Sequence, residues 1–297
     1  MKWTPGTEND DVVDMRGASG GGGGGGGGGV GMRLGGGGLV AAIVVALVAR
    51  VFGVDVTGLF GGHGQSSSPS QSQSQTPQPR TGEDPDKKLV DFVKFVMKDV
   101  QTTFDGLFKA DGRQYRHAKL VVFASVIDTG CGRSSAEIGP FYCPPDEEAY
   151  IDLSFYQELR ERFGAPGEFA KAYVLAHELG HHLQNLLGIE KAQLHFAGTS
   201  KRERNAQSVK LELQADCFAG VWGHSANERK ILDVGDLDQA LTAASAIGDD
   251  RLQQQAGMNP NAETFTHGTS EQRKRWFKRG FDTGRLDQCD TFAASTL

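Results

Sequence analysis

Two stretches of low complexity limit how much of this chain can build a hydrophobic core. Residues 20–29 are an unbroken glycine run. Residues 64–84 are mostly Ser, Gln and Pro with almost no apolar side chain, which is typical of a solvated linker. We therefore expect a disordered glycine-rich segment over residues 1–33 and a linker over residues 55–85. Residues 86–297 are then left to form one domain of ordinary size.

An apolar segment lies between these two stretches. Residues 39–49 contain only Leu, Val, Ala and Ile, and the wider segment 34–54 is long enough to cross about 30 Å of hydrocarbon as a helix. A buried helix of a soluble domain is the alternative, but neither flank supplies a domain around it. We expect residues 34–54 to be one N-terminal transmembrane helix. Arg16 and Arg33 precede it and Arg50 lies near its end, which favours a cytoplasmic N-terminus and an extracytoplasmic domain at the inner membrane.

The charge of the chain argues against one broad class of partner. There are 31 Lys and Arg against 37 Asp and Glu, which gives a net charge of −6. Two basic clusters, at residues 201–204 and 273–279, are typical of solvated helix faces. We expect no nucleic-acid partner.

Four cysteines bear on the compartment of the domain. None has C-x-x-C spacing, and an even number favours two disulfides in an oxidising compartment over four free thiols in the cytoplasm. Pairing Cys131 with Cys143 would close a short loop, and pairing Cys217 with Cys289 would tie down the C-terminal tail. Four cysteines allow three connectivities, so the pairing stays open here.

Hydrophobic periodicity predicts an α+β domain that is mainly helical with a small sheet. Apolar residues recur at helical spacing between Leu89 and Phe104, which predicts a packing helix. Residues 119–127 and 149–153 have the composition and alternation of strands. A strand close to a binding site can pair with an extended substrate through its backbone, and we assign this role to residues 149–153 as a hypothesis.

The sequence His177-Glu178-Leu179-Gly180-His181 is the strongest functional signal. It lies in a helical pattern that begins near Gly167 and is expected to stop at Gly188. A step of four residues places His177 and His181 about 40° apart around a helix, so both imidazoles can reach one metal ion. Glu178 then lies beside the ion and can act as a base. His182 lies about 140° from His177, and we expect it to face solvent or a neighbouring helix.

A catalytic zinc site needs a third protein ligand and a position for water. Residues 208–222 are a helical stretch in which Glu212 and Asp216 share one face, with Ala215, Ala219 and Gly220 allowing a close approach of another helix. This spacing offers Glu212 as the third ligand and Asp216 as a residue that orients a histidine. The alternative is a pair of carboxylates on a water-facing helix side.

These motifs resemble those of a known family. The H-E-x-x-H and E-x-x-x-D elements are similar to those of gluzincin metallopeptidases. More closely, several blocks in order resemble the bacterial membrane-anchored family of putative neutral zinc metallopeptidases. The blocks are Gly139-Pro-Phe-Tyr-Cys143-Pro, Tyr150-Ile-Asp-Leu-Ser-Phe155, residues 176–184, residues 213–222 and Thr266-His-Gly-Thr-Ser-Glu-Gln-Arg273. The resemblance runs from about residue 86 to the C-terminus.

The resemblance implies a zincin-like metallopeptidase domain after one N-terminal transmembrane helix. It implies that His177, His181 and Glu212 ligate one catalytic Zn²⁺ ion and that Glu178 is the catalytic base. By similarity to peptidases with a His-Pro-x-x-x-x-Arg element, His267 would donate a hydrogen bond to the oxyanion and Arg273 would brace the site. The implied activity is that of a zinc metalloendopeptidase acting on protein or peptide substrates.

Two other functions share these features. A membrane-anchored interaction or assembly protein could keep the zinc without turnover, although a structural site needs no base and closes its fourth position. A hydrolase for a non-peptide amide, such as a cell-wall cross-link, would use the same mechanism on another substrate.

Overall fold

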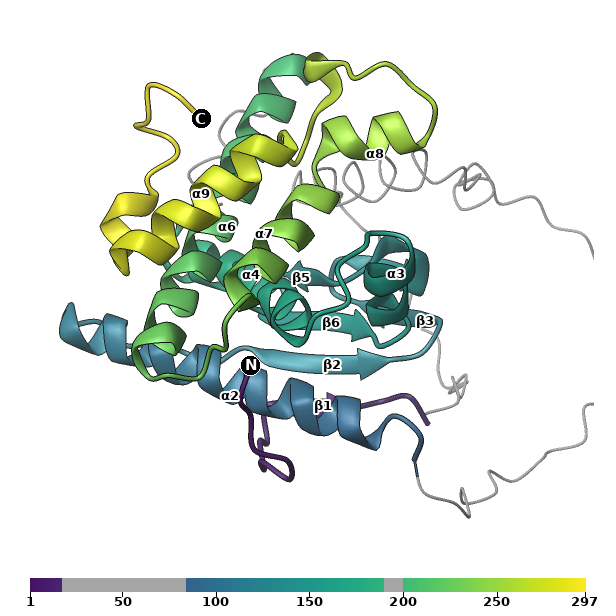
Figure 1. The fold of residues 1–297 in the computed structure, drawn as a ribbon, viewed down its shortest axis with the longest axis vertical. Helices are drawn as coiled ribbons and strands as arrows, with labels where there is room; N and C mark the ends of the chain where they lie inside the picture. Colours follow the sequence, from purple (N-terminus) through teal and green to yellow (C-terminus); the bar gives the residue numbers. More distant parts are fainter. Residues whose placement is uncertain (18–83, 190–199) are drawn as a thin grey trace, which may run out of the picture.

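A four-stranded sheet lies at the centre of the structured part of the chain (Figure 1). The computed structural model describes residues 1–17, 84–189 and 200–297. The strand order is β1-β2-β6-β5, with β1, β2 and β6 parallel and β5 antiparallel to β6. The strands are β1 Val12–Asp14, β2 Lys119–Phe123, β5 Phe141–Cys143 and β6 Glu148–Asp152. A separate hairpin pairs β3 (Val126–Thr129) with β4 (Gly132–Ser135).

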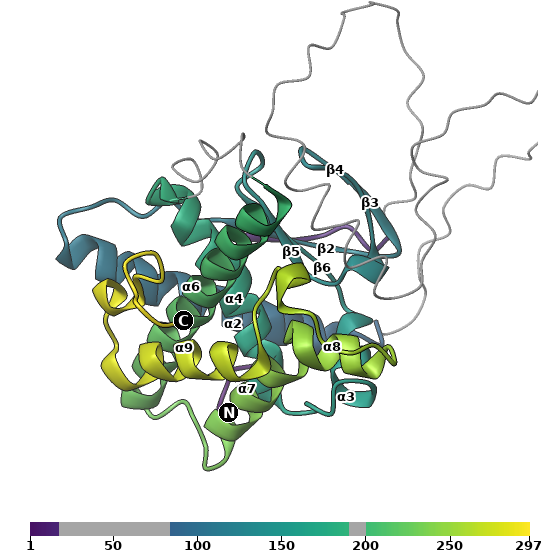
Figure 2. The same ribbon diagram turned by 90° about the horizontal axis from the view of Figure 1, so that it is seen from above.

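The two faces of the sheet are covered by different elements. Along β2, Leu120 and Val122 belong to the main hydrophobic core with the helices, whereas Val121 and Phe123 pack with residues of the hairpin. Because successive side chains of a strand point to opposite faces, this alternation places the helices on one side only. Figure 2 shows the hairpin on the side of the sheet away from α4, α6 and α9.

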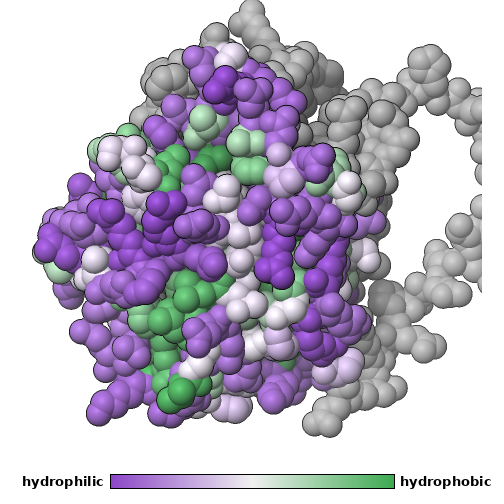
Figure 3. Space-filling model, turned by 45° about the horizontal axis from the view of Figure 1, so that its top comes forward, coloured by the Kyte–Doolittle hydropathy of each residue, from purple (hydrophilic) through white to green (hydrophobic). Residues whose placement is uncertain are grey.

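The helical layer contains most of the apolar residues that the sequence pattern marked. The helices are α2 Lys87–Ala110, α3 Phe155–Glu161, α4 Glu168–Leu186, α6 Lys201–Glu228, α7 Asp236–Ala246, α8 Asp249–Gln255 and α9 Ser270–Thr283. The expected helix over 89–104 forms part of α2, and the expected metal-binding helix is α4. The face of the molecule drawn in Figure 3 is mostly hydrophilic, with separate hydrophobic patches. The described residues therefore form a mixed α+β domain, as predicted.

Two predictions about the strands need correction. The strand expected over 119–127 breaks after Phe123, because Ser125 has a φ of 65° and the chain turns there into the hairpin. The hypothesis that residues 149–153 pair with substrate is wrong, since both edges of β6 are already occupied by β2 and β5. The strand at the sheet edge nearest α4 is β5.

The N-terminus also differs from the prediction. Residues 1–33 were expected to be disordered, but residues 1–17 belong to the fold: β1 pairs with β2, and Met1, Trp3 and Val12 pack against the main core. Residues 18–33, the apolar segment 34–54 and most of the predicted linker lie outside the described residues. Within the described ranges, no helix combines the length and apolar character needed to span a membrane.

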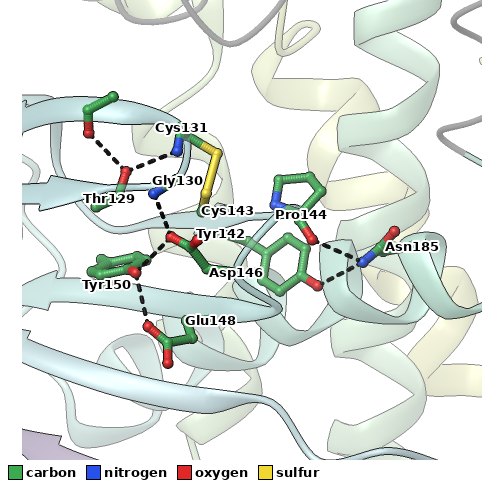
Figure 4. The surroundings of a disulfide bond; sticks show 11 residues. Thr129, Gly130, Cys131, Tyr142, Cys143, Pro144, Asp146, Glu148, Tyr150 and Asn185 are labelled. Atoms are coloured by element: carbon green, nitrogen blue, oxygen red, sulfur yellow. Dashed lines mark hydrogen bonds between the residues drawn. A yellow bond between two sulfur atoms is a disulfide. The ribbon is translucent and has the colours of Figure 1, made fainter. Parts of the chain in front are cut away.

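The structure contains both of the disulfide pairs that were considered from the sequence. Cys131 is bonded to Cys143, which ties the β3–β4 turn to β5, and Cys217 is bonded to Cys289, which ties α6 to the C-terminal tail. Figure 4 shows the first bond and, beside it, Asn185 of α4 donating to the hydroxyl of Tyr142. The disulfide-bonded edge of the sheet is thus held against the helix that carries the H-E-x-x-H motif.

Candidate metal centre

Helices α4 and α6 approach closely where the motif lies. A Cβ atom added at Gly180 would lie 2.9 Å from the Cα of Ala215, which is closer than real Cβ contacts. The glycine inside the H-E-L-G-H sequence therefore lets the backbones come together. This contact brings the motif of α4 opposite Glu212, one turn before Ala215 on α6.

Three side chains converge between the two helices. The Nε2 atom of His177 lies 3.1 Å from Oε2 of Glu212, and the Nε2 atom of His181 lies 3.5 Å from Oε1 of the same carboxylate. One ligand atom from each of the three residues lies within 4.8 Å of the other two. The structure thus brings together the three residues that the sequence predicted as metal ligands.

The second ring nitrogen of His177 is held by a buried polar network. Its Nδ1 lies 2.9 Å from Oδ1 of Asp216, which also accepts a hydrogen bond from the hydroxyl of Tyr173. The guanidinium of Arg273 donates to both oxygens of Asp216, at 2.7 and 2.9 Å. Asp216 and Arg273 therefore lie where the sequence analysis placed them, and Tyr173 is an addition to that prediction.

The pKa values in this network follow from burial and charge. Burial alone would raise the pKa of Asp216, but Arg273 and His177 outweigh it and hold the pKa below the ordinary value. Burial alone would lower the pKa of His177, but Asp216 and Glu212 raise it to about 10. The His177 imidazole, with a carboxylate beside each ring nitrogen, is therefore a favourable binding site for a cation, whether a proton or a metal ion.

Gln184 holds the second ring nitrogen of His181, a role that sequence reasoning missed. The Nδ1 atom of His181 lies 2.9 Å from Oε1 of Gln184, while Nε2 of Gln184 donates to the carbonyl of Leu211 at 2.7 Å and to Gln214 at 3.1 Å. Because a carbonyl can only accept, the amide is fixed with its oxygen toward His181. His181 then carries its proton on Nδ1 and directs the lone pair of Nε2 toward Glu212. The i, i+3 spacing of His181 and Gln184 was the available signal.

Glu178 lies on α4 next to these groups and is buried, with 7% of its surface exposed. Among the residues that the structure describes, none donates a hydrogen bond to its carboxylate. Burial raises its pKa, and the nearby His177 and His181 only partly oppose that effect. A buried carboxylate with a raised pKa and free acceptor capacity is suited to take a proton from water.

His267 reaches the site from the loop before α9, and Asp249 positions it. Oδ2 of Asp249 accepts the backbone N–H groups of Thr266, His267 and Gly268, and its Oδ1 lies 3.2 Å from Nδ1 of His267. Burial alone would lower the pKa of His267, but Glu212 and Asp249 raise it. Because a carboxylate can only accept, Nδ1 of His267 donates to Asp249, and the ring is near enough to Glu212 for their charges to interact. Nothing in the local sequence marked Asp249, because its role depends on a contact across 18 residues.

His182 does not join the centre. It is fully buried, with Nδ1 at 2.9 Å from the hydroxyl of Tyr142 and Nε2 at 2.6 Å from the carbonyl of Arg116. It therefore links α4 to β5 and to the loop before β2, and the expectation that it faces solvent or a neighbouring helix is wrong.

The donor set fits a zinc ion. Two imidazoles and one carboxylate offer ligand atoms at one point, and the other nitrogen of each imidazole is engaged by Asp216 or Gln184. These features define a candidate H-E-x-x-H metal site, with the third candidate ligand on a neighbouring helix. The chain belongs to the family described as "Putative neutral zinc metallopeptidase", whose model matches residues 1–292.

Relatives of similar length support this assignment. The chain is 47% identical over 296 residues to Uncharacterized protein YpfJ of Escherichia coli K12, covering 99% of this chain and 100% of the relative. It is 42% identical over 232 residues to Uncharacterized protein Rv2575 of Mycobacterium tuberculosis H37Rv, covering 74% of this chain and 76% of the relative. No solved structure matches the chain, so the zincin-like fold stays a prediction.

Proposed function

We propose that the protein is a zinc-dependent metalloendopeptidase in which His177, His181 and Glu212 hold the ion. One observation carries the proposal: the two Nε2 atoms and the Glu212 carboxylate meet at one point while both Nδ1 atoms are engaged elsewhere. The family to which the chain belongs supports zinc and a peptide substrate. A site with three protein ligands leaves a position for water, which a purely structural zinc site does not.

The roles of the other residues follow from their positions. Bound zinc would supply Lewis acidity, lowering the pKa of water toward about 7 and polarising the scissile carbonyl. Glu178 accepts the proton of the attacking water and returns it to the leaving amine. His267, kept as a donor by Asp249, stabilises the negative charge that develops on the carbonyl oxygen. Asp216 and Gln184 keep the two imidazoles in the orientation that the ion requires.

We place the catalytic domain outside the cytoplasm, attached to a membrane through residues 34–54. The two disulfides support the oxidising compartment, because such bonds are rare in cytosolic proteins. The net charge of −6 supports a partner other than nucleic acid.

The test is hydrolysis of unfolded casein by the full-length protein in detergent. We expect activity that a chelator removes and zinc restores. Glu178→Gln should keep one zinc ion and lose about 10²- to 10⁴-fold in kcat, the usual contribution of a positioned base. Glu263→Gln, at an exposed position, is the matched control. Zinc-replete Glu178→Gln protein that still cleaves casein at the wild-type rate would refute the assignment, and a zinc-loaded wild type inactive on any peptide would favour an assembly role.

A further inference from the structure

The N-terminal residues 1–17 form an edge of the catalytic domain. Val12, Val13 and Asp14 pair in parallel register with residues 120–122 of β2, and the N–H of Met15 donates to the carbonyl of Val122 at 2.7 Å. A sheet edge left without this strand would expose unpaired backbone groups of β2. The strand is therefore part of the sheet.

Side chains hold this segment at three further points. The indole of Trp3 donates to Glu168 on α4 at 3.2 Å and packs edge-to-face on Phe92 of α2. The carboxylate of Asp11 accepts from the amide of Gln101 at 2.9 Å and lies 2.8 Å from the ring of His117. These contacts reach two helices and the loop before β2.

Residues 16 and 84, which flank a part of the chain outside the described residues, lie together. Arg16 contacts the carboxylate of Asp84 at 2.7 Å and that of Asp86 at 3.0 Å. The chain therefore leaves the domain after β1 and re-enters it at α2 from the same place. A hydrocarbon layer about 30 Å thick cannot lie between groups that form hydrogen bonds.

We propose that residues 1–17 and residues 84–297 lie on the same side of the membrane, as parts of one domain. This topology differs from the single passage expected from the sequence, which would put β1 and β2 on opposite sides. The family model matches from residue 1, and the Escherichia coli relative is matched over its full length, so the N-terminal segment belongs to what these proteins share. The proposal concerns the topology of the chain and does not depend on catalysis.

The test is cysteine labelling of the full-length chain in intact bacterial cells with a membrane-impermeant maleimide. The four native cysteines are in disulfides and should not react. Glu8→Cys reports on the N-terminal segment, since 89% of the Glu8 side chain is exposed, and Glu263→Cys, at 64%, reports on the domain. Lysed cells give the full extent of labelling. Asp10→Cys and Arg202→Cys are second reporters if one variant folds poorly.

In intact cells we expect the maleimide to label both Glu8→Cys and Glu263→Cys, or neither of them. Labelling of both supports the proposal together with an extracytoplasmic domain, and protection of both supports it with a domain inside the cell. Glu263→Cys labelled while Glu8→Cys is protected, or the reverse, would overturn the proposal. Activity on casein is a separate measurement, so failure of the proposed function would be recognised independently.

Discussion

Replacing Gln184 with Met tests whether the environment of His181 was correctly inferred. Methionine is close to glutamine in length and removes the amide oxygen that accepts from Nδ1 of His181. The imidazole then loses the group that fixes its tautomer and ring orientation. Removing such an outer partner of a metal-ligating histidine usually lowers metal affinity about 10- to 100-fold, which is about 1.4–2.7 kcal/mol.

The same substitution also reduces stability, and this effect must be separated from zinc binding. Gln184 donates to the carbonyl of Leu211 and to Gln214, and buried groups left without a partner cost about 1–3 kcal/mol each. Gln214→Met is the matched control. It breaks the bond to Gln184 and the bond from Gln214 to the carbonyl of Cys289, but leaves the contact between Gln184 and His181 in place.

The assay is competition for zinc against a chromophoric chelator at pH 7, with thermal unfolding of each metal-free variant measured in parallel. Both variants should unfold at lower temperature than the wild type. Only Gln184→Met should lose about 10-fold or more in zinc affinity. Equal zinc affinities for Gln184→Met and Gln214→Met would refute the inference that Gln184 orients a ligand.

Three further outcomes follow from the same structure. Gly180→Ala should destabilise the protein by about 1–3 kcal/mol in thermal unfolding, because its Cβ meets the backbone of Ala215; an unchanged Tm would contradict this. Replacing Cys217 and Cys289 by Ala should cost about 4 kcal/mol in denaturant unfolding, since a loop of 72 residues is released; a loss below 1 kcal/mol would argue against the bond. The lowered pKa of Asp216 stabilises the fold above about pH 3.9, and this stability is lost as the pH falls through the folded-state pKa. Asp216→Asn should therefore make the Tm depend less on pH at the acid end. A Tm that falls with pH as steeply as in the wild type would refute this reasoning.

Local spacing carried most of what could be predicted about the site. The stripe from Phe169 to Leu187 and the stop at Gly188 located α4 within a few residues, because helical periodicity and a C-terminal glycine are encoded in adjacent residues. Glu212 and Asp216 were predicted by the same means, since they share a helix face. Their contact with the histidines depends on how α4 and α6 cross, and the sequence offered only small residues as a hint.

The N-terminal strand could not be predicted for a different reason. β1 has three residues and only Val12 packs against the core, so it shows too little alternation to be recognised. The neighbouring glycine run then dominated the interpretation of the whole segment. Pairing with β2 supplies what the local sequence lacks, because a short strand gains its stability from a sheet that is already formed.

Charge at the centre gives the strongest physical reason to expect a divalent ion. Glu178, Asp216 and the guanidinium of Arg273 are buried, and the Glu212 side chain beside them is 13% exposed. Three ionised carboxylates and one guanidinium give this group a charge of −2 when the imidazoles are neutral. Such an imbalance is costly in a protein interior. Without a metal ion, Asp216 and Glu212 favour the protonated form of His177 and raise its pKa. A Zn²⁺ ion would balance the charge and displace that proton, so zinc binding should release protons and weaken as pH falls. Calorimetry in buffers of different ionisation enthalpy measures this release directly, and zinc binding without proton release would contradict the charge argument.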